Sequence, residues 1–147
     1  MATMTEATLR WTGGTMFEAA GTNGATLQID MPIELDGTGN GFHPMELLLH
    51  ALGGCMAVTL AQILTRQRLA LDAYTVTLWG ERAEQPPTRY THIVVEHRFR
   101  GQGLTRANLE RLVSMVEERY CAVAATLPHG LAEQVVIIED GVMGVGF

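Results

Sequence analysis

Lysine is absent from this 147-residue chain, in which all ten basic residues are arginine. Its absence excludes Schiff-base chemistry at a lysine and the lysine of a phosphate-binding P-loop. Serine is almost absent: Ser114, the single one, lies in a helical pattern without a G-x-S-x-G turn, which argues against a serine hydrolase. The formal net charge is −6, so the chain has no excess of basic charge and we expect no nucleic-acid partner.

Cysteine is scarce, with Cys55 and Cys121 standing 66 positions apart. Two cysteines are too few for a disulfide framework. No charged segment followed by a short apolar run opens the sequence, so we expect no secretory signal and a cytoplasmic location. In that reducing compartment the two cysteines are structural thiols, redox thiols or metal ligands.

The spacing of the histidines does not favour a metal site. His92 and His97 are an odd number of residues apart on a predicted strand, so they point to opposite faces. His43 and His50 would lie two turns, roughly 10 Å, apart along a helix. The histidines therefore give no support to the interpretation of the cysteines as metal ligands.

The longest apolar run covers residues 44–66 and predicts a central helix. Residues 47–64 carry no formal charge, and apolar side chains occur on every side of the helix, which predicts that it is covered all round. Polar residues and a Gly-Gly pair interrupt the run, and Glu46 and Arg66 close it, so a core helix is favoured over a membrane span. A second subunit is the expected additional cover.

The other segments predict shorter elements. Residues 4–12, 15–20 and 25–32 form a three-stranded meander with turns at Gly13-Gly14 and Asn23-Gly24. Two further strands, 71–83 and 90–100, precede an amphipathic helix that begins at Thr105 and runs to Cys121, and a last strand covers 133–141. The order βββ-α-ββ-α-β predicts one α+β domain, residues 1–147, with helices packed on a largely antiparallel sheet.

Three glycines at alternate positions occupy the loop 35–43, directly before the central helix. A glycine loop at a helix start can bind an anion. The G-x-G-x-G spacing matches no nucleotide-binding pattern, so a mobile connecting loop is favoured.

Each cysteine has two interpretations at this point. Cys55, in the middle of an apolar helix, has the setting of a packing residue, because burial makes a thiol inert. Cys121 follows Arg119 at a predicted helix end, where the arginine could favour a thiolate. A redox role for the pair is the alternative to packing.

Two segments resemble the OsmC/Ohr family. PMELLL at 44–49 with ALGGC at 51–55 forms one motif, and ERYCAV at 118–123, followed by Thr126 and Leu127, forms the other. The resemblance extends to the order of elements over nearly the whole chain. It implies sheets of two subunits wrapped around a pair of buried central helices in an intertwined homodimer.

The resemblance also implies a thiol peroxidase that reduces organic hydroperoxides at the dimer interface. Cys55 matches the peroxidatic cysteine and Cys121 the resolving cysteine, and an external dithiol would reduce their disulfide without any metal or organic cofactor. Met45 stands where peroxidase members have a glutamate, and Thr15 where they have an arginine. Glu46 is the candidate replacement carboxylate, although it also fits a first-turn residue favoured by the helix dipole.

Two further hypotheses remain open. The chain could be a non-catalytic OsmC-like dimer that binds an apolar small molecule or senses oxidation. In the simplest alternative, both cysteines only fill space in the core.

Overall fold

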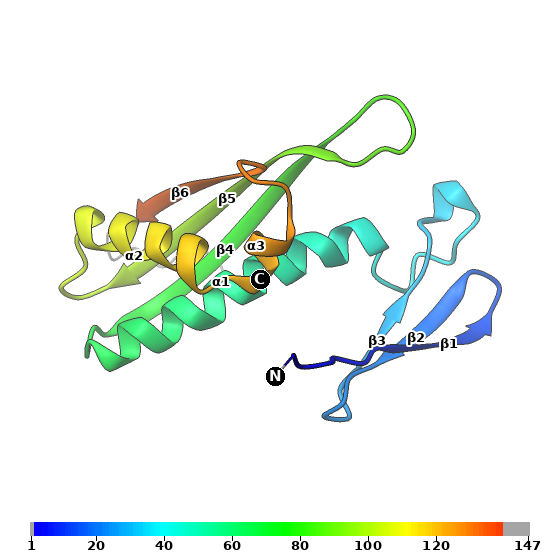
Figure 1. Ribbon diagram of the computed structural model, residues 1–147, viewed down its shortest axis with the longest axis horizontal. Helices are drawn as coiled ribbons and strands as arrows, with labels where there is room; N and C mark the ends of the chain where they lie inside the picture. Colours follow the sequence, from blue (N-terminus) through cyan, green and yellow to red (C-terminus); the bar gives the residue numbers. More distant parts are fainter. Residues whose placement is uncertain (1, 140–147) are drawn as a thin grey trace. The chain divides into compact units, whose positions relative to one another are not determined.

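The computed structural model describes residues 2–139 and divides the chain into two compact units, Met1–Leu48 and Leu49–Phe147. The first unit contains three strands, β1 (Thr8–Gly13), β2 (Met16–Ala20) and β3 (Thr26–Ile29), followed by the short 3-10 helix η1 (Ile33–Leu35). The helix α1 (Pro44–Arg66) begins in this unit and continues into the second (Figure 1). A single domain over residues 1–147 stays a prediction.

The predicted N-terminal meander is confirmed. The strands β1, β2 and β3 pair antiparallel in chain order. Gly13 and Gly14 make the first turn at φ values of 121° and 56°, which favour glycine. In the second turn the backbone N–H of Gly24 donates to Gly21 and the Asn23 side chain accepts from Ala25 N.

The sheet β1-β2-β3 has one apolar face. The strand register places Ala19 between Leu9 and Leu27, and Phe17 between Trp11 and Ile29. The opposite face carries polar residues such as Arg10 and Glu18, which form an ion pair. Two of the apolar side chains stay 54% (Leu9) and 63% (Trp11) exposed. We call the apolar side of this sheet the apolar sheet face; it consists of Leu9, Trp11, Phe17, Ala19, Leu27 and Ile29.

The loop after β3 is tied to Asp30 by hydrogen bonds, and the mobility expected for residues 35–43 stays a prediction. The carboxylate of Asp30, 1% exposed, accepts hydrogen bonds from the hydroxyls of Thr15 and Thr38 and from the backbone N–H of Thr38 and Met31. These bonds, that of Thr15 first, hold the pKa of Asp30 well below its usual range. A Cβ at Gly37 would lie 1.7 Å from the carbonyl oxygen of Met31, so glycine is required there.

The second unit contains most of α1 and a second sheet with two more helices. Its elements are β4 (Leu71–Arg82), β5 (Tyr90–Gly101), α2 (Arg106–Arg119), α3 (Ala122–Thr126) and β6 (Ala132–Ile138). The sheet order is β4-β5-β6. Ile93, Val95 and Phe99 are fully buried, as the alternation of β5 predicts. The N-cap prediction is also confirmed, because the Thr105 hydroxyl accepts from Asn108 N.

The predicted, largely antiparallel arrangement is confirmed, and the last strand is its exception. β6 pairs with β5 in parallel, from Ile93 opposite Ala132 to Phe99 opposite Ile138. The reason is the connection: the chain crosses over through α2 and α3, and such a crossover returns a strand in the same direction (Figure 1). Residues 140 and 141 of the predicted strand 133–141 lie outside the described residues.

Only one side of α1 is buried in the described chain, whereas the sequence predicts cover all round. The buried residues are Leu52, Gly53, Met56, Leu60 and Leu64. Close packing explains Gly53, since a Cβ there would lie 2.5 Å from Leu78 Cδ1 of β4. On another side lie small or apolar residues at alternating spacings of three and four, which we call the α1 stripe: Ala51, Gly54, Val58, Ala61 and Thr65. Val58 is 62% exposed.

Candidate active site

Cys55 lies in the middle of α1, one turn after the buried Leu52. It is half-buried, and its carbonyl oxygen accepts a hydrogen bond of 2.9 Å from the Thr59 hydroxyl. The helix places the thiol at the edge of the buried side of α1.

Cys121 lies at the break between α2 and α3 and is 2% exposed. Its backbone N–H donates to the Val116 carbonyl at 2.8 Å as α2 ends. Its sulfur accepts from the backbone N–H of Ala124 at 3.3 Å, so the thiol is the N-cap of α3. The segment after Cys121 is therefore a separate short helix with a cysteine cap.

The structure brings the two thiols together. The pKa of Cys121 is raised to about 11, mainly because the thiol is buried. The Ala124 N–H acts in the opposite direction and lowers this pKa, and the interaction with the Cys55 side chain contributes to raising it. At neutral pH Cys121 is therefore protonated and able to donate its S–H to Cys55. Two adjacent thiols can form a disulfide once one of them is oxidised, and Cys55 is the more accessible of the two.

The other residues that the resemblance singles out lie in the first unit. Glu46 is exposed in the first turn of α1, where the helix dipole favours a carboxylate. Thr15 donates its hydroxyl to Asp30, and Arg10 pairs with Glu18 at 2.6 Å. A catalytic role for Glu46 stays a prediction.

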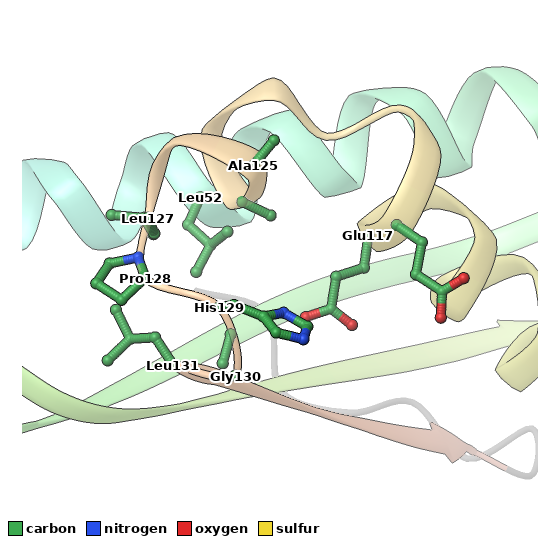
Figure 2. Close-up of a pocket in the computed structure, with 11 residues that line it drawn as sticks. Leu52, Glu117, Ala125, Leu127, Pro128, His129, Gly130 and Leu131 are labelled. Atoms are coloured by element: carbon green, nitrogen blue, oxygen red, sulfur yellow. The ribbon is translucent and has the colours of Figure 1, made fainter.

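A cavity of about 420 Å³ lies in the second unit between α1, the end of α2, α3 and the loop before β6 (Figure 2). Leu52 and Ala124 are among the residues that line it. Both are near a cysteine: Leu52 precedes Cys55 by one turn of α1, and the backbone N–H of Ala124 donates to Cys121 Sγ. The sequence did not predict this cavity, because its other walls come from segments that were interpreted as an exposed helix face and a helix end.

A buried polar chain crosses the second sheet. The Tyr74 hydroxyl lies 2.8 Å from His97 Nδ1, and His97 Nε2 lies 2.8 Å from Gln134 Oε1. The Gln134 amide N–H donates to Glu117 at 3.3 Å. A carboxylate only accepts, so the Gln134 oxygen faces His97, His97 Nε2 carries a proton, and Tyr74 donates to Nδ1. His97 is therefore neutral and fully hydrogen-bonded, although it is 0% exposed.

We expect His97 to make stability depend on pH. Burial lowers its pKa, so the folded state favours neutral imidazole, and the stability that this provides is complete above the unfolded pKa of about 6.5 and is lost as the pH falls below it. Urea unfolding at pH 7.5 to 5 should show a loss of stability toward low pH, for which a single proton sets the limit at about 1.4 kcal/mol per pH unit. His97→Gln should flatten this dependence, whereas His129→Gln, at an exposed position, should not. An unchanged slope in His97→Gln would contradict the assignment.

Within residues 2–139, no cluster of three or more His, Cys, Asp or Glu side chains is placed to hold a metal ion. In the part of the chain that the structure describes, α1 is the one helix with the length and composition of a membrane span.

Comparison with known proteins identifies the class. A family model described as OsmC-like protein matches residues 37–133, so the chain belongs to the OsmC-like family. This confirms the predicted family and its α+β fold, and it makes α1 the core helix of a soluble fold.

Particular relatives are similar to different extents. Protein YhfA of Escherichia coli K12 is 38% identical over 84 residues, which are 57% of this chain and 63% of YhfA. The match thus spans less than two thirds of that relative. A hypothetical protein from Aquifex aeolicus VF5 has a TM-score of 0.80 and 25% identity over 94% of this chain and 98% of its own. An organic hydroperoxide resistance protein OsmC, a predicted redox protein from Legionella pneumophila, has a TM-score of 0.64 over 95% and 99%, and at 20% identity it shows the fold alone.

Proposed function

We propose that this protein is a cytoplasmic thiol peroxidase that reduces organic hydroperoxides through a Cys55–Cys121 dithiol cycle, as a defence against oxidative stress. The observation that carries the proposal is that Cys55, in α1, and Cys121, at the α2–α3 break, lie close enough for Cys55 to help raise the pKa of the Cys121 thiol. The names of structural neighbours from Legionella pneumophila and Bacillus subtilis, both organic hydroperoxide resistance proteins, support the choice of substrate class.

The cycle needs only the two cysteines and an external dithiol. The Cys55 thiolate attacks the O–O bond, so the peroxide leaves as an alcohol and Cys55 becomes a sulfenic acid. The Cys121 thiol then displaces water from that sulfenic acid, forming the Cys55–Cys121 disulfide. A dithiol reduces this disulfide to two thiols and is itself oxidised to a disulfide. No metal or organic cofactor enters these steps.

A homodimer is part of the proposal. The α1 stripe repeats at the spacing that packs one helix against another, and its residues are small enough for close approach. The apolar sheet face of the first unit also leaves large side chains uncovered, with Trp11 63% exposed. Apolar surface of this kind marks an interface more often than a solvated face. A second copy of the chain would cover both surfaces.

A non-catalytic dimer is the second candidate function. The observation that favours it is the pair Met45 and Thr15, which stand where the resemblance places a glutamate and an arginine; Thr15 is already bound to Asp30. Such a protein would bind an apolar small molecule or sense oxidation without turnover.

A free-thiol count tests the proposed function. The reduced protein is treated with one equivalent of tert-butyl hydroperoxide, or of hydrogen peroxide, and the remaining thiols are titrated. We expect both thiols of each chain to be lost, because Cys55 and Cys121 are neighbours and can form a disulfide. The loss should be faster with the organic peroxide, the proposed substrate. Survival of both thiols would contradict the peroxidase and favour the non-catalytic dimer.

A further inference from the structure

We propose that the cavity beside the cysteine pair receives the reductant of the Cys55–Cys121 disulfide and selects an apolar thiol that carries a positive charge. The inference rests on the proposed dithiol cycle and names the chemical class of its second substrate. It is carried by the position of the cavity, by its apolar walls and by the carboxylates at one end.

The position of the cavity places an occupant beside the disulfide. Its volume of about 420 Å³ is large enough for a small organic molecule. The wall residue Ala124 donates its N–H to Cys121 Sγ, and the wall residue Leu52 lies one turn from Cys55 on α1. Neither cysteine lines the cavity itself, so an occupant is separated from each of them by the wall residues Leu52 and Ala124. Our proposal is that a thiol at the end of a short chain passes between these wall residues to the disulfide.

The lining of the cavity is divided by polarity. The apolar side chains of Leu127, Pro128 and Leu131 lie at one end, Glu117 lies at the other, and the ring of His129 lies between them (Figure 2). Glu118 also contributes to the lining. These two glutamates attract a cation and repel an anion, so an apolar molecule with a positive group fits both parts.

The carboxylates are only partly used by the protein itself. One oxygen of Glu117 accepts from Gln134, and one oxygen of Glu118 accepts from Ser114 at 3.4 Å. An ionised carboxylate has about four acceptor positions, so each group keeps capacity for a ligand ammonium.

The reductive step is a thiol–disulfide exchange. The reductant thiolate attacks one sulfur of the Cys55–Cys121 disulfide, which breaks that bond, forms a mixed disulfide and releases the other cysteine as a thiolate that takes up a proton. A second thiolate then attacks the reductant sulfur of the mixed disulfide; it belongs to the same molecule when the reductant is a dithiol and to a second molecule when the reductant is a monothiol. The protein then holds two thiols, and the reductant leaves as its own disulfide.

The test compares three thiols of equal chain length that differ only at the far end: 6-aminohexanethiol, 6-mercaptohexanol and 6-mercaptohexanoate. The protein is first oxidised with diamide, so the result does not depend on its reaction with peroxide. The rate of disulfide reduction is measured at pH 8, above the range in which free imidazole gains a proton. We expect the amine to react faster than the carboxylate by on the order of tenfold or more at low salt.

Variants distinguish the effect of the cavity glutamates on the reaction rate from the effect of the net charge of the protein. Glu117→Gln and Glu118→Gln should each reduce the preference for the amine. Glu110→Gln makes the same charge change on the same helix, but Glu110 does not line the cavity and pairs with Arg106 at 3.5 Å. The preference should be unchanged in this control. Equal rates for the three thiols, or an equal loss of preference in Glu110→Gln, would overturn the proposal and leave the peroxidase cycle intact.

If diamide does not produce the disulfide, ligand binding to the reduced protein tests the cavity instead. Hexylamine and hexanoate are added to the reduced protein, and the thermal midpoint is recorded for the wild type and for Glu118→Gln. Stabilisation by hexylamine that Glu118→Gln weakens supports the cavity assignment. No stabilisation by the amine, or equal stabilisation by the acid, overturns it.

Discussion

Replacing Cys55 with serine is expected to abolish peroxide reduction, with a loss on the order of a thousandfold or more. Loss of the nucleophile removes the covalent step, because a serine hydroxyl is not ionised at neutral pH and does not attack an O–O bond. Cys121→Ser should behave differently: Cys55 is oxidised once, and the cycle then stops for lack of a resolving thiol. The measurements are steady-state turnover and trapping of the sulfenic acid by a diketone reagent.

Neither substitution is expected to disturb the fold. Cys121 caps α3 through its sulfur, and serine is a preferred N-cap residue, so Cys121→Ser can keep the hydrogen bond from Ala124 N. Both variants should retain the circular dichroism spectrum of the wild type. Full turnover in Cys55→Ser would show that another residue reduces the peroxide and would end the proposed mechanism.

Replacing Val58 with aspartate is expected to separate the proposed homodimer into monomers. Val58 is the centre of the α1 stripe and is 62% exposed in the single chain. In a symmetric interface the substitution places two unpaired carboxylates in apolar surroundings, each at a cost of about 2–5 kcal/mol. The apparent dissociation constant should rise by on the order of a thousandfold or more, as sedimentation velocity would show.

Ala107→Asp serves as the control for charge, because Ala107 is an exposed residue in the first turn of α2, where a carboxylate is tolerated. This variant should sediment as the wild type does. A Val58→Asp protein that remained dimeric at low concentration would place the interface elsewhere and remove the α1 stripe from the proposal.

The helices and strands could be predicted from the sequence because the spacing of apolar residues that marks them involves only neighbouring residues. The alternation along 90–100 identified Ile93, Val95 and Phe99 as inward-facing, since side chains of a strand alternate between two faces. The same alternation carries no information on strand direction, which is why the parallel pairing of β6 was missed. The long connection from Gly101 to Ala132 was the available signal, because parallel strands need a crossover.

The candidate site could be predicted only in part. Cys55 and Cys121 were paired through the family resemblance, and the hydrogen-bonding contact between them agrees with that pairing. The partners of buried polar groups were not predicted: Asp30 bonds Thr15 and Thr38, and His97 bonds residues of two other strands. Such contacts depend on tertiary structure, and no spacing in the sequence encodes them.

The parallel position of β6 determines the order in which the chain can assemble. β4 and β5 form a hairpin from neighbouring segments, so they pair early, whereas β6 must wait until the crossover through α2 and α3 is made. During synthesis on the ribosome, His97 emerges before Gln134, its partner in the finished fold. Until then, the imidazole Nε2–H lacks the acceptor it has in the finished fold. The arrival of the last strand therefore completes the core, and a nascent chain that ends before residue 132 would expose this defect to quality control by proteases.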